Sequence, residues 1–302
     1  MKKYSFFAIC LMAIIFAGCD QPSAFHPSGD ESNNPSGVNG IGIFSIAKDK
    51  KVTFSRGNLQ YTQTTNTWSF AENQWDYIGT NNVTGCIVEG EGYKGGEDLA
   101  IKIDLFGWSG STGLAKFGIS TSADFHDYSG SFADWGKNKI GNDAPNTWRT
   151  LTYEEWDYLL NNRPYAQLLK GSAQVNGVNG LILLPDNWSA PNDVTFKSGF
   201  YDFGESYDGP SGYGLQQTFT PAQWSVLESS GAVFLPASGM RVYASVQNVQ
   251  WYGWYWSATE GDDDEDLEGY TATSIAFGST WLSLQHEWAR VYASSVRLVM
   301  DL

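Results

Sequence analysis

The sequence contains few basic residues. Only 18 Lys and Arg stand against 33 Asp and Glu, which gives a formal net charge of −15 at pH 7. A chain this acidic is repelled by nucleic acid and by anionic lipid surfaces, and no basic patch offsets that repulsion. The small number of basic residues therefore argues against nucleic acid as a partner. The acidity itself has two explanations, cation binding and solubility at a crowded surface.

Motifs of common catalytic chemistries are also missing. The sequence has no Gly-x-Ser-x-Gly nucleophile elbow and no P-loop or dinucleotide-binding fingerprint. A Ser-His-Asp triad assembled in space is still compatible with the sequence. So is a hydrolase that uses paired carboxylates from long loops.

Long apolar runs are absent except at the start, where Lys2 and Lys3 precede the run from Phe6 to Ala17. This pattern is typical of a signal peptide, and the run is shorter than the roughly 20 residues of a membrane-spanning helix. The following Gly18-Cys19 resembles the lipobox of bacterial lipoproteins, although Phe16 replaces the usual aliphatic residue. The sequence predicts a signal peptide over residues 1–18 and lipid on Cys19; a secretory signal with a chance cysteine is the alternative.

Cysteine is scarce, with three residues in the chain. Cys10 lies in the predicted signal peptide and Cys19 carries the predicted lipid, so Cys86 has no partner for an intrachain disulfide. The domain must then be stabilised by its core, for which 13 Trp, 16 Tyr and 17 Phe are available. Nothing near Cys86 in sequence would lower its pKa, which favours a spectator thiol over a nucleophile.

The mature chain divides into a tether and a domain. Residues 19–40 are rich in Ser, Pro, Asn and Gly and predict a flexible tether. Residues 41–302 predict a single α+β domain with many short strands, two capped helices and long loops. Strands are predicted at 41–46, 51–55, 59–63, 68–70, 101–108, 252–258, 271–277, 281–284 and 296–300.

Two capping boxes predict the helices. Thr152 with Glu155 begins the first, and Thr220 with Gln223 begins the second, where Pro221 occupies the first helical position. Each helix is followed by a short apolar strand that ends in Leu-Pro.

Several ordered blocks resemble a known family. Residues 148–156 (WRTLTYEEW) are similar to the start of the Fibrobacter major paralogous domain family. Residues 234–241, 255–260 and 295–299 resemble its later blocks, so the family core covers about 146–300. Three further blocks, at 54–61, 70–77 and 104–108, resemble those of Bacteroidales lipoproteins.

The resemblance implies a C-type-lectin-like fold, related to the sulfatase-modifying enzymes. Those enzymes bind copper through two cysteines late in the chain, and this chain has none after Cys86. The resemblance therefore does not carry that oxidase chemistry. The calcium-binding triplets of sugar-binding C-type lectins are also absent.

The most concentrated charge lies at residues 261–269, GDDDEDLEG. Clustered carboxylates suit Ca²⁺, and Asp262, Asp264 and Asp266 match the first three ligands of an EF-hand loop. The match then fails, because Leu267 replaces the required Gly and Thr273 replaces the bidentate Glu. Calcium is thus the one candidate cofactor, and a solvated hairpin tip is the alternative.

The most aromatic segment is 251–256, WYGWYW. As a strand it places Tyr252, Trp254 and Trp256 on one face and Tyr255 on the other. That first face could form a stacking platform for sugar rings, or both faces could be core. Both interpretations stay open at the level of sequence.

Isolated histidines and arginines complete the candidates. His126, and His286 with Glu287, could serve in metal or acid–base sites, but neither has a second His or a Cys pair nearby, which favours surface positions. Arg149, Arg241 and Arg297 lie in the family-like blocks, and we expect them to form buried or half-buried structural ion pairs.

These observations favour a non-catalytic binding module for a glycan or a protein, anchored to the outer membrane through lipid on Cys19. We expect the cell surface, with the periplasmic face as the alternative. A carboxylate-dependent hydrolase and a structural or adhesin subunit of a surface assembly are the competing hypotheses.

Overall fold

The computed structural model describes residues 42–79, 102–113, 115–120, 122–200, 217–243, 245–262 and 269–302. All of them belong to one compact unit, Pro35–Leu302. The predicted signal peptide, Cys19, the tether and Cys86 lie outside the described residues, as do the side chains of His286 and Glu287.

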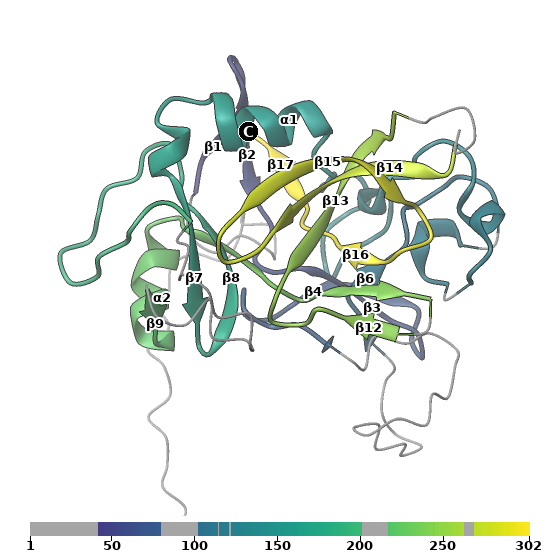
Figure 1. The fold of residues 1–302 in the computed structure, drawn as a ribbon, viewed down its shortest axis with the longest axis horizontal. Helices are drawn as coiled ribbons and strands as arrows, with labels where there is room; N and C mark the ends of the chain where they lie inside the picture. The colour runs from purple at the N-terminus through teal and green to yellow at the C-terminus, as the bar shows by residue number, and fades with distance from the viewer. Residues whose placement is uncertain are drawn as a thin grey trace, which may run out of the picture. The chain divides into compact units, whose positions relative to one another are not determined.

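The described chain is a mixed α+β structure with many short strands in several sheets and two α-helices (Figure 1). The predicted α+β class is therefore confirmed. No helix among the described residues has the length and apolar character needed to cross a membrane.

The described strands form sheets of different sizes. From one edge to the other, the largest contains β15 (Leu282–Ala289), β14 (Thr271–Phe277), β13 (Gly253–Glu260), β16 (Ser294–Ser295) and β6 (Leu105–Phe106). A second contains β10 (Val233–Pro236), β8 (Val178–Leu183), β7 (Lys170–Val175) and β9 (Thr218–Phe219). The smaller sheets are β1 (Phe44–Ala47), β2 (Lys50–Phe54) and β17 (Val299–Asp301); β4 (Thr67–Phe70), β3 (Leu59–Thr62) and β5 (Lys102–Ile103); and β11 (Met240–Val242) with β12 (Ser245–Gln247).

The helical segments are short. They are η2 (Lys116–Gly118), η3 (Phe125–Tyr128), η4 (Trp135–Lys137), α1 (Tyr153–Asp157), η5 (Tyr158–Asn162), η6 (Ala166–Leu168) and α2 (Pro221–Ser229). The segment η5 is π-helical and continues α1 directly.

The first four predicted strands form two antiparallel hairpins, β1–β2 and β3–β4. The last strand, β17, pairs with β2, so the C-terminal end of the domain closes onto its first hairpin. The two strands that end in Leu-Pro are also neighbours, with Leu181 opposite Leu235 in the β8–β10 pair. Strands β7, β9, β11, β12 and β16 were not predicted, because their segments lack a clear alternation or span only two or three residues.

Both predicted capping boxes form. In α1 the Thr152 hydroxyl accepts from the backbone N–H of Glu155 (3.2 Å), and the Glu155 carboxylate accepts from the N–H of Thr152 (3.0 Å). In α2 Gln223 accepts from the N–H of Thr220 (2.9 Å), and Pro221 stands at the first position. These contacts satisfy N–H groups that a helix start leaves without partners.

Strands β13 and β14 are buried on both faces. Tyr255 packs with Ile275 in one hydrophobic cluster, whereas Trp256 packs with Ala272 in another. Alternation along a strand sends neighbouring side chains to opposite faces, so one sheet divides two cores. A third cluster lies around Trp224 of α2.

Lys170 binds the last turn of η5 through its buried ammonium group. Its side chain is 4% exposed, and Nζ donates to the carbonyl oxygen of Leu160 (2.5 Å) and to the side-chain oxygen of Gln167 (2.9 Å). Burial, reinforced by the nearby charge of Arg163, lowers the pKa of Lys170 from 10.5 to about 8.

This pKa predicts a pH dependence of stability. Between pH 8 and 10.5 the unfolded chain binds more protons at Lys170 than the folded chain does. The free energy of unfolding of the wild type should therefore rise, relative to that of Lys170→Met, as pH increases through this window. Urea titrations across the window measure the difference, with Lys197→Met, at an exposed lysine, as the control. A flat difference between wild type and Lys170→Met would contradict the prediction.

Candidate functional site

Six aromatic side chains form a continuous line on one side of the largest sheet. Two of the rings lie in strands, Trp254 in β13 and Trp288 in β15, and the other four lie in turns and loops next to strands. In order, this aromatic row consists of Trp281, Tyr252, Trp254, Trp288, Tyr292 and Tyr243. Successive ring centroids are 5.5, 5.5, 5.6, 5.6 and 5.9 Å apart in that order. Such separations are those of aromatic pairs in contact.

The row lies partly open to solvent. Tyr243 at one end is 40% exposed, Trp254 in the middle is 7% exposed, and the other four rings are half-buried. Trp254 is stacked against Trp288 with an interplanar angle of 14°. The buried ring of Trp254 therefore packs against the half-buried rings of Tyr252 and Trp288.

Uncharged polar side chains lie beside the row. Trp254 is opposite Ala276 on β14, and Ala276 is opposite Ser283 on β15, so the three side chains share a face. By the same argument Gln285 shares this face, opposite Ser274. Ser283 and Gln285 are half-buried. Aromatic surface with a few polar groups is the usual composition of a ligand site.

Strained backbone occurs next to the row. Tyr243, Asn248 and Gln250 have φ values of 54°, 58° and 68°, in the left-handed region. The Gln250 side chain holds its position by accepting from the N–H of Asn179 (2.8 Å) and donating to the Tyr77 hydroxyl (2.7 Å). Strain of this kind costs about 1 kcal/mol or more per residue and is often found at functional sites.

The three predicted sugar-stacking residues separate in the structure. Trp256 is 1% exposed, and its Nε1 donates to the carbonyl oxygen of Phe106 (2.6 Å), so it is core. Trp254 is nearly buried, and Tyr252 is half-buried in the row. Trp256 therefore belongs to the core, where it packs in one cluster with Phe106 and Trp108, which is the alternative that the sequence left open for this face. Ligand binding by Tyr252 and Trp254 stays a prediction.

Four members of the row were missed from the sequence. Trp281, Trp288, Tyr292 and Tyr243 come from other segments, and only the high density of aromatic residues between positions 243 and 292 signals them. The pairing of β15 with β14, and of β14 with β13, brings together the residues near β13 and β15, and the bridge between Arg241 and Ala293 brings Tyr243 to Tyr292.

The predicted metal site is only partly described. Asp262 is exposed, and Asp264 and Asp266 lie outside the described residues. Within the described part of the chain, no group of three or more His, Cys, Asp or Glu side chains could hold a metal ion. The calcium site stays a prediction.

His126 is a surface residue, as predicted. Its side chain is 77% exposed, and Nδ1 lies 2.8 Å from Oδ1 of Asp124. The contacts with His126 lower the pKa of Asp124, mainly through the backbone N–H of His126.

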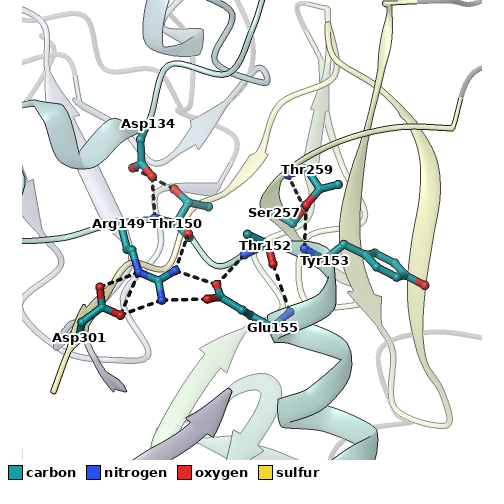
Figure 2. A network of polar contacts seen from close by, with 9 residues as sticks. All are labelled: Asp134, Arg149, Thr150, Thr152, Tyr153, Glu155, Ser257, Thr259 and Asp301. Carbon is teal, nitrogen blue, oxygen red and sulfur yellow. Dashed lines mark hydrogen bonds and ion pairs between the residues drawn. The ribbon is translucent and has the colours of Figure 1, made fainter. Parts of the chain in front are cut away.

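Arg149 forms the predicted half-buried ion pairs. Figure 2 shows its guanidinium between Asp301 of β17 and Glu155 of α1, with contacts of 2.8 and 2.7 Å. Burial opposes the charge of Arg149, but the hydrogen bonds to Asp301 and Glu155 outweigh it and raise the pKa of Arg149. Because Glu155 also completes the capping box, one cluster joins the helix start to the C-terminal strand.

The same network holds the chain before α1. Asp134 accepts from the N–H groups of Gly136 (2.9 Å) and Thr150 (3.0 Å), and burial raises the pKa of this carboxyl. On the other side, the N–H of Tyr153 donates to the Thr259 hydroxyl (3.0 Å; Figure 2). The family-like block at 148–156 is thus used for structure.

Arg297 departs from the prediction of an ion pair. It is 1% exposed, and its guanidinium donates to the side-chain oxygens of Gln74 (2.6 Å) and Asn58 (3.4 Å). Gln74 in turn donates to the Glu228 carboxylate (2.9 Å), so a neutral amide relays the contact between the two charges. Arg241 is 2% exposed and donates to the carbonyl oxygen of Ser120 (2.9 Å).

Comparisons with protein-family models, curated proteins and solved structures found no match to this chain.

The Arg149 network predicts a loss of stability on mutation. Arg149→Lys should lower the free energy of unfolding by about 1–3 kcal/mol, because an ammonium group cannot bridge two carboxylates as a planar guanidinium does. Urea denaturation measures the change, with Arg56→Lys, whose partner is the carbonyl oxygen of Glu72, as the control. A change below about 0.5 kcal/mol, the size of an exposed pair, would contradict it.

Proposed function

We propose that the chain is a lipid-anchored, non-catalytic binding module at the outer membrane, and that its ligand packs along the aromatic row. The row carries the proposal: six rings in contact, five of them partly open to solvent around the buried Trp254, with hydroxyl and amide side chains beside them. The signal peptide and Cys19 support the location. The mixed architecture and the ordered sequence blocks support a C-type-lectin-like fold.

A glycan is the ligand that this chemistry favours. Each ring contacts the next one along the row, and such an arrangement suits a linear ligand with repeated apolar faces. The C–H faces of sugar rings pack on the negative faces of aromatic rings, and their hydroxyls can bond with Ser283 and Gln285. The net charge of −15 favours a neutral glycan over an acidic one.

A structural role in a surface assembly is a second candidate. Strand β15 is eight residues long and lies at the edge of its sheet, with β14 as its partner among the described residues. An edge strand can pair with a strand of another chain. Light scattering of the purified protein tests this role, and a monomer at all concentrations would contradict it.

Substitutions in the row test the binding function. The mature chain with Cys19→Ser is screened against neutral oligosaccharides of glucose, xylose, mannose and N-acetylglucosamine, and against a glycan array. Trp281→Ala and Tyr292→Ala should each raise the Kd for a bound glycan by roughly tenfold or more, because buried aromatic contacts dominate binding energies.

The matched control is Tyr165→Asn, which removes an exposed tyrosine outside the row and keeps a residue type that tolerates its left-handed φ of 60°. Equal Kd values for Trp281→Ala, Tyr292→Ala and the control would show that the row is not the binding surface.

A further inference from the structure

The most exposed large apolar side chain among the described residues is Tyr165, at 77%. Leu168, three positions later, is 61% exposed. Tyr165 directly precedes the 3₁₀ turn η6 (Ala166–Leu168), and the N–H of Leu168 donates to the Tyr165 carbonyl oxygen, so one tight turn carries both side chains. Tyr165 and Leu168 therefore form one apolar projection, which we name the tip (residues 164–168).

The backbone holds the tip in place. Tyr165 has φ of 60°, a left-handed conformation that an aromatic residue rarely adopts. The N–H of Leu168 donates to the carbonyl oxygen of Tyr165 (2.8 Å), and the N–H of Ala166 donates to that of Arg163 (3.1 Å). The chain thus keeps a strained turn whose two largest apolar side chains stay mostly exposed.

The two basic residues that flank the tip in sequence, Arg163 and Lys170, are buried. Arg163 is 3% exposed and bonds to Asp186 (3.0 Å) and to the carbonyl oxygen of Leu159 (2.8 Å). Lys170 is 4% exposed and directed to carbonyl oxygens. Residues 164–169 carry no charge, so the tip is a neutral patch on an acidic chain.

The tip lies beside the first strand of the domain. Asp186, which binds Arg163, also accepts from the N–H (2.9 Å) and hydroxyl (2.6 Å) of Ser45 in β1. The Arg163 guanidinium lies over the Phe44 ring, 5.6 Å from its centre. Figure 1 shows β1 passing next to the helical segment that follows α1. The chain enters the domain a few residues before this point.

We propose that the tip inserts Tyr165 and Leu168 into the headgroup region of the membrane that carries the lipid anchor. This inference rests on the proposed acylation of Cys19. A tether of about 22 residues, as the sequence predicts, would have a root-mean-square length of roughly 25 Å if it behaves as a random coil, and would keep the domain near the membrane without orienting it. An apolar contact beside the tethered end supplies the orientation.

The chemistry of the tip matches uncharged lipid. Tyrosine has an apolar ring and a polar end, and it is enriched at membrane–water interfaces for that reason. The absence of basic side chains on the tip, together with the acidity of the chain, disfavours anionic headgroups. The partner is therefore a bilayer with zwitterionic headgroups.

A spin label at Leu168→Cys, in a Cys86→Ser background, tests the proposal. The full chain is placed in vesicles of phosphatidylcholine and phosphatidylethanolamine. The label should become accessible to oxygen and protected from a water-soluble nickel reagent. A label at Ala123→Cys, an exposed residue of another loop, should stay accessible to nickel. A label at 168 that stays in water overturns the proposal.

Two measurements test the anchor and the tip separately. Mass spectrometry of the chain that keeps Cys19 reports whether this residue is acylated. The spin label at position 168 is read on the Cys19→Ser chain at high vesicle concentration, where no anchor holds the domain at the membrane. An unmodified Cys19 contradicts the proposed anchor, whereas the label still tests the tip. For the unacylated chain, Tyr165→Asn with Leu168→Gln should lower vesicle binding roughly tenfold. Protection of the label without vesicles would indicate a protein contact and overturn the proposal.

Discussion

Burial of β13 and β14 on both faces is the constraint on which the rest of the structure depends. The aromatic side chains of β13 bond as well as pack: the Tyr255 hydroxyl donates to the carbonyl oxygen of Pro236 (2.9 Å), and Trp256 donates to that of Phe106. In addition, Nε1 of Trp108 donates to the carbonyl oxygen of Ser257 in β13 (3.0 Å). These hydrogen bonds connect segments distant in sequence to the largest sheet. The sheet in turn fixes the positions of the aromatic residues of the row.

Charged side chains inside the domain serve the same purpose. Arg149 connects α1 to the C-terminal strand through Glu155 and Asp301, and Arg297 reaches Glu228 through the amide of Gln74. A buried guanidinium without such acceptors would cost several kcal/mol, so each of these residues fixes the segments around it. The sequence blocks that suggested a family are therefore used for folding, and the exposed chemistry lies elsewhere.

Two apolar surfaces of the described residues, the aromatic row and the tip, differ in kind. The aromatic row is half-buried and lined by uncharged polar groups, which suits a ligand with both apolar faces and hydroxyls. The tip at Tyr165 and Leu168 is exposed, neutral and strained, and it stands next to the first strand. The proposed membrane contact and the proposed ligand site therefore use separate surfaces.

Much of the local structure follows from the sequence, because it depends on neighbours in the chain. The capping residues Thr152 and Thr220 determine the helix starts, and the aromatic and β-branched residues of β13 and β14 favour the strands found in the structure. The sequence alone also indicates the lipid on Cys19, which the described residues do not include. Only the tertiary structure decided that Trp256 is core, that Arg297 bonds to amides, and that Tyr243 and Trp281 belong to one row. The physical reason is that strand pairing, which brings residues tens of positions apart into contact, sets which side chains water can still reach.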